Sequence, residues 1–92
     1  MGDSVYIVSI SDTYDGEKDN KIYVYARYGD AEKRFFSEVA RTKEWLDESS
    51  SKDMYTIDEN YTKGWQQSFA LYKTGYYNED NKSVDLIRQS VL

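Results

Sequence analysis

The chain has 92 residues, with 17 acidic and 12 basic side chains and a formal net charge of −5 at neutral pH. This length predicts one small domain over residues 1–92, and the negative balance argues against sequence-independent binding to phosphate backbones. The chain has no cysteine, which excludes disulfides and zinc–thiolate sites, and no histidine, which removes the commonest general base. Large aliphatic residues are few, so ten tyrosines and two tryptophans are expected to supply much of the buried area.

The N-terminal segment predicts a strand followed by an acidic turn. Ser4–Ser11 is rich in β-branched residues, and its two apolar faces favour a central position in a sheet. Asp12–Asn20 is polar and suggests a calcium loop, but its acids lack the alternating spacing of an EF-hand. We therefore predict no metal site here. The acids that we regard instead as candidates for partner binding are Asp12, Asp15, Glu17 and Asp19.

A second strand is predicted over Lys21–Tyr28, where apolar and polar positions alternate cleanly. One set of side chains is Ile22, Val24 and Ala26, and the other is Tyr23, Tyr25 and Arg27. We expect the aliphatic set to face the helix and the second set to form an exposed surface suited to binding. The alternative is that tyrosine is merely a good strand former that tolerates half-exposure.

The strongest local pattern is an amphipathic helix over Asp30–Ser49. Its apolar stripe recurs at steps of three or four and comprises Ala31, Phe35, Val39, Thr42 and Leu46. Asp30 is the expected N-cap because its carboxylate can accept hydrogen bonds from the free N–H groups of the first turn.

The predicted helix end is acidic, although a helix C-terminus favours cations. Glu44, Asp47 and Glu48 crowd its last turn, either as a solvated helix end or as an acidic patch kept for a partner. Trp45 lies off the apolar stripe, either under a neighbouring loop or as an interface anchor.

The C-terminal half predicts further strands. Met54–Ile57 fits a short third strand, and Trp65–Tyr77 fits a strand or a helix. We favour a hairpin in which Asn78–Asn81 forms the turn and Ser83–Arg88 the returning strand; a pair of helices is the alternative. The predicted fold is α+β, in the order β-β-α-β-β-β, with one main helix packed on an antiparallel sheet.

Catalytic machinery is missing from the sequence. Without His or Cys, only carboxylate pairs or a Ser/Lys arrangement remain, and the five glycines are scattered rather than grouped in a phosphate loop. We therefore expect no enzyme, no cofactor and no metal. No apolar run is long enough for a signal peptide or membrane span, which predicts a soluble protein of the bacterial cytoplasm.

Small size, acidity, tyrosine content and missing catalytic residues resemble the acidic single-domain inhibitors of phages, such as anti-restriction DNA mimics and anti-CRISPR proteins. This resemblance implies a host protein partner with a basic nucleic-acid-binding surface. A local likeness joins DAEKRFFSEVA and SFALYKTGYYNED to small nonstructural proteins of microviruses, in which a helix precedes an "LY-x-x-G-x-[YF]" hairpin. The residues that match this pattern are Leu71, Tyr72, Gly75 and Tyr77.

Three hypotheses follow from the sequence. In the first, a phage or mobile-element protein blocks a host nucleic-acid-binding protein, with acids standing in for phosphates and Tyr23, Tyr25 and Trp45 as apolar anchors. In the second, Tyr23 and Tyr25 stack on single-stranded nucleic acid beside Arg27, against the net charge. In the third, the tyrosine surface is the interface of a structural homodimer.

Overall fold

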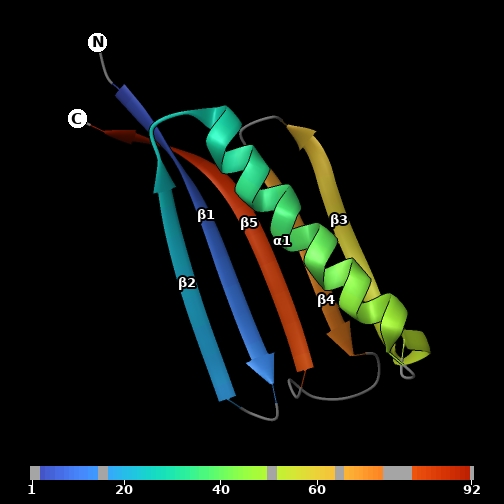
Figure 1. The fold of residues 1–92 in the computed structure, drawn as a ribbon. Coiled ribbons are helices and arrows are strands. Elements are labelled where there is room, and N and C mark those ends of the chain that lie inside the picture. Colours follow the sequence, from blue (N-terminus) through green and yellow to red (C-terminus); the bar gives the residue numbers. More distant parts are fainter. Residues whose placement is uncertain (1–2, 15–16, 50–51, 64–65, 74–79, 92) are drawn as a thin grey trace.

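The structure is a computed structural model that describes residues 3–14, 17–49, 52–63, 66–73 and 80–91. One long helix packs on a five-stranded antiparallel sheet (Figure 1), which confirms the predicted α+β class and element order. The elements are β1 (Asp3–Tyr14), β2 (Glu17–Tyr25), α1 (Tyr28–Glu48), the short 3-10 helix η1 (Lys52–Met54), β3 (Tyr55–Lys63), β4 (Gln66–Lys73) and β5 (Asp80–Val91).

The sheet has the order β2-β1-β5-β4-β3, so the last strand of the chain occupies its centre. β5 pairs with β1 along its whole length, from Asp3 opposite Val91 to Tyr14 opposite Asp80. The two apolar faces of β1 predicted a central position, but β5 occupies the centre, and β1 is the inner strand between β2 and β5. In Figure 1, α1 runs obliquely across one face of the sheet and leaves the other face without a covering layer.

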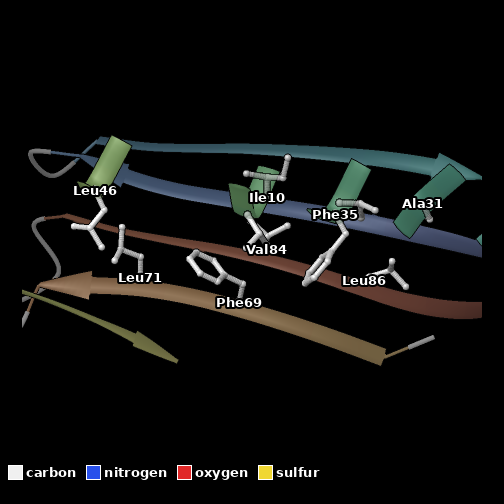
Figure 2. Close-up of a cluster of buried hydrophobic side chains, with 10 residues drawn as sticks. Ile10, Ala31, Phe35, Leu46, Phe69, Leu71, Val84 and Leu86 are labelled. Carbon is white, nitrogen blue, oxygen red and sulfur yellow. The ribbon is translucent and has the colours of Figure 1, made fainter. Parts of the chain in front are cut away.

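The core lies between α1 and the sheet (Figure 2). The helix contributes its predicted stripe, and Phe35 is fully buried at its middle. Thr42 belongs to this stripe because its hydroxyl donates to the backbone carbonyl of Glu38, at 2.8 Å, which leaves the methyl group for packing. From the sheet come alternate residues of the inner strands: Val8, Ile10, Phe69, Leu71, Val84 and Leu86. Six half-buried tyrosines pack around this core: Tyr6, Tyr23, Tyr25, Tyr28, Tyr55 and Tyr61.

The helix begins two residues before the predicted start, and Asp30 is not its N-cap. The N-cap position is Arg27, and Asp30 lies in the first turn, where its charge still suits the helix dipole. The reason is Tyr28, whose ring packs edge-on against Tyr6 with centroids 5.6 Å apart. Its hydroxyl donates to Glu32 at 2.5 Å and accepts from the buried Gln67 at 2.7 Å. These contacts favour helical backbone from Tyr28 onward.

The predicted orientation of the second strand is wrong. Ile22 and Val24 are 68% and 60% exposed, whereas Tyr23 and Tyr25 pack against the core under α1. The helix stabilises this orientation through Arg34, whose Nε donates to the Tyr25 hydroxyl at 3.0 Å and whose guanidinium lies 4.4 Å from the ring centroid of Tyr23. The two long aromatic rings fill the space at the edge of the helix that shorter aliphatic side chains would leave empty.

The ambiguous C-terminal region is a pair of strands, so the two-helix alternative is wrong. β4 and β5 pair antiparallel, with Phe69 opposite Val84. Asp80 and Asn81, which were assigned to the turn, begin β5, while positions 74–79 lie outside the described residues. The third strand also extends beyond its prediction, from Tyr55 to Lys63, and Met54 belongs to η1.

We expect the fold to lose stability in alkali, because burial and a neighbouring carboxylate raise the pKa of Tyr28 and of Tyr61 to about 12, from 10.0. Between pH 10 and about pH 12, Tyr28 and Tyr61 keep their protons in the folded protein but lose them in the unfolded chain. Stability is therefore full below about pH 10 and falls as the pH rises toward 12. Urea denaturation at pH 8, 10 and 11.5 measures the decline. The double variant Y28F/Y61F should show a smaller decline than the parent, and an equal one would contradict this origin.

Candidate acidic end

The acids predicted for partner binding gather at one end of the molecule, which extends over 49 × 22 × 17 Å. Figure 1 shows the end of β1, the start of β2 and the C-terminal end of α1 at the same end of the sheet, opposite the start of β1. We call this the acidic end and define it by six exposed carboxylates: Asp12, Glu17, Asp19, Glu44, Asp47 and Glu48. Asp15 lies outside the described residues. Segments far apart in sequence thus reach the same end of the sheet.

Two of these acids stand directly opposite each other. Asp12 on β1 pairs in register with Asp19 on β2, and both are exposed. Like charges on neighbouring strands destabilise a sheet, here offset in part because Asp12 has Lys82 of β5 on its other side. The Asp12–Asp19 pair therefore adds nothing to the stability of the fold.

The acids at the C-terminal end of α1 are also placed where they do not stabilise the fold. Its last turn contains no basic residue, so Glu44, Asp47 and Glu48 oppose the helix dipole without compensation. Trp45, between them in sequence, is 49% exposed and contacts Tyr55 edge-on, with ring centroids 5.7 Å apart. The indole packs on the first residue of strand β3 rather than under a loop, and about half of the side chain is exposed. Its role as an interface anchor stays a prediction.

An open pocket of about 330 Å³ lies between the helix end and the sheet. Asp12 of β1 and Trp45 of α1 both line it, whereas the other five carboxylates of the acidic end do not. Arg41 and Lys82 also line it, so its charged lining residues are two cations and one acid. Arg41 is held by Glu38, a buried carboxylate 3.6 Å away that also lies 3.8 Å from Arg34.

Tyr23 and Tyr25 are not part of the acidic end. They lie farther along β2, opposite Val8 and Tyr6, with the guanidinium of Arg34 against them. Stacking a nucleobase on Tyr23 would require displacement of this guanidinium, which removes the main support for the second hypothesis.

The pocket residues Tyr55 and Lys82 were not predicted as site residues. Tyr55 follows η1 and reaches the pocket from the outer strand β3, and Lys82 reaches it from the central strand β5. Only the pairing of the strands places them beside Asp12, and the sequence of each strand carries no signal for that pairing.

In the described part of the chain, no group of three or more His, Cys, Asp or Glu side chains is arranged to hold a metal ion. Nor does any described helix have the length and apolar character needed to cross a membrane. No protein-family model, curated protein or solved structure matches this chain.

Proposed function

We propose that this protein is a non-catalytic inhibitor, of phage or mobile-element origin, that binds the basic nucleic-acid-binding surface of a host protein through its acidic end. The observation that carries the proposal is that exposed acids of β1, β2 and α1 lie at one end of the molecule, where Trp45 is also half exposed. At Asp12, Asp19 and the helix end these charges act against local stability.

The acidic end suits the recognition of a basic surface in two ways. Its exposed carboxylates resemble phosphates in charge, which steers the approach of a positively charged partner and weakens with salt. Trp45 supplies the kind of half-exposed aromatic anchor that dominates binding energy at protein interfaces. Together they provide fast encounter and a point of tight contact without any catalytic group.

Competition with DNA tests the proposal. Purified bacterial DNA-binding proteins are each bound to a fluorescent duplex, and the fall in anisotropy is measured as this protein is added. At least one duplex should be displaced, less effectively as salt rises. The triple variant E44K/D47K/E48K should compete roughly 100-fold more weakly, at about 1 kcal/mol for each reversed charge.

The matched control is D3K/D30K/D58K, which reverses three exposed acids outside the acidic end. Either triple variant changes the net charge from −5 to +1, because each reversal adds two charges. The control should keep most of the competing activity if the position of the charges matters. Equal losses in both variants, or the absence of any displaced duplex, would contradict the proposal. A low-salt gel shift of single-stranded oligonucleotides by the protein alone would instead support the nucleic-acid-binding hypothesis.

A further inference from the structure

The face of the sheet opposite α1 carries an apolar patch. Ile7 of β1 stands in register between Val24 of β2 and Ile87 of β5, so these three side chains form one row across the sheet. Ile22 and Val5 belong to the same face, two residues along their strands. Ile22, Val24 and Ile87 are 68%, 60% and 40% exposed, which is unusual for β-branched aliphatic residues grouped together. We call this surface the open sheet face.

The inner strands of the open sheet face carry little charge. On β1 from Val5 to Thr13, and at the positions of β5 and β4 that pair with this face, Asp85 is the single charged residue among those described. The outer strands add one charge of each sign, Lys18 of β2 opposite Thr13 and Asp58 of β3 opposite Ala70. The whole chain is 32% charged, so the ionic side chains are concentrated elsewhere. The remaining positions hold mainly small neutral residues, which allow a second layer to approach closely: Ser9, Ser11, Ser68, Ala70 and Ser83.

Asp85 shows that water is already partly excluded from this face. It stands in register with Ser9 on one side and Ser68 on the other, near the aliphatic row. Burial raises the pKa of the Asp85 carboxyl above its ordinary value, because its ionised form is poorly hydrated there.

We propose that the open sheet face packs against the same face of a second copy of this chain, forming a two-fold symmetric dimer with the two helices on the outside. Each copy carries a net charge of −5, so two copies repel each other least when they meet through a surface with few ionic groups. The inner strands of the open sheet face bring one charged side chain, Asp85, into the contact, and the acidic ends stay outside it.

The size of the face agrees with a stable dimer. Neighbouring strands lie about 4.8 Å apart and residues on one face recur about every 6.8 Å, so each residue covers about 33 Å². About twenty residues then cover roughly 650 Å² per copy, before the relief of the side chains is counted, against about 800 Å² per partner in a standard interface. The two sheets would pack about 10 Å apart, as in a β-sandwich. This inference does not depend on the proposed inhibitor function.

Sedimentation equilibrium from 1 to 500 μM tests the dimer. The parent protein should dimerise in this range, and I22K/V24K should raise the dissociation constant at least tenfold. That variant changes the net charge from −5 to −3, so weaker association cannot come from greater overall repulsion. The control is I57K, which alters an isoleucine that is 38% exposed and lies on the helix side of β3, opposite Leu71. Its dissociation constant should stay within twofold of the parent.

A second measurement locates the interface without disturbing it. The chain has no cysteine, so S9C places a single thiol on the open sheet face and S37C places one on the exposed side of α1. With excess thiol reagent, the S9C rate should fall at least tenfold as protein rises from 1 to 500 μM, while the S37C rate stays constant. A monomeric parent, an I22K/V24K variant that dimerises as well as the parent, or concentration-independent S9C labelling would each overturn the dimer.

Discussion

Replacement of Phe35 by alanine is expected to destabilise the fold by about 3–5 kcal/mol, because it removes a large side chain from a site that cannot collapse. Phe35 is fully buried on the middle turns of α1 and contacts Tyr61 edge-on, with ring centroids 5.9 Å apart. A small domain has a total stability of only about 5–10 kcal/mol, so the variant should lose about half of it or more. Its melting temperature, measured by circular dichroism, should fall by about 15 °C or more.

The adjacent residue provides the control. Phe36 is 39% exposed, and its ring meets Tyr61 with centroids 5.3 Å apart at the border of the core. Phe36→Ala removes the same atoms one position along the same helix, yet should cost only about 1 kcal/mol. Similar losses from the two variants would mean that α1 is rotated about its axis relative to the packing in Figure 2.

The helix stripe and the element order could be predicted because each depends on local pattern. The spacing of the stripe does not depend on where the helix begins. An error of two residues in its start therefore leaves Phe35, Val39 and Leu46 on the same buried face. The start itself was mispredicted because it depends on a long-range contact. Tyr28 accepts a hydrogen bond from Gln67, 39 residues away, and no local rule anticipates that bond.

The predicted orientation of β2 was wrong for a different physical reason. Alternation divides a strand into two faces, but it does not say which face is buried when both sets are apolar enough. The preference for aliphatic residues inside favoured Ile22 and Val24. Tyr23 and Tyr25 face the helix instead, half-buried, because their rings are larger and Arg34 of α1 contacts both of them. The arginine lies on the polar flank of the helix, where the sequence gives no sign of its partner.

The acidic end was half predictable. From the sequence, the acids of the helix end were recognised as poorly placed for stability, and those of Asp12–Asn20 as candidates for partner binding in a turn. Their meeting at one end follows from the antiparallel arrangement of β1 and β2, which carry Asp12, Glu17 and Asp19, and from the direction of α1. The topology therefore determines where the acids of the acidic end lie, and the sequence determines their chemistry.

A second large effect is expected from Val84→Asp. Val84 is fully buried on the central strand β5, between Ile10 of β1 and Phe69 of β4. A carboxylate there has no partner in the apolar core that surrounds it, and burial of an unpaired acid costs about 4 kcal/mol or more, even if the acid is protonated. Because β5 joins the two halves of the sheet, we expect the variant to be unfolded at neutral pH, with no cooperative thermal transition.

The same substitution at Val24 separates burial from position in the sheet. Val24 also lies on a strand but is 60% exposed on the open sheet face, so Val24→Asp should cost about 1 kcal/mol or less, mainly through the weaker strand propensity of aspartate. Both variants are measured at about 1 μM, the lower end of the dimerisation range, so that loss of a dimer does not add to the result. If Val24→Asp unfolds the protein as Val84→Asp does, the aliphatic side of β2 faces the helix after all. The open sheet face, and with it the dimer, would then lose its central row.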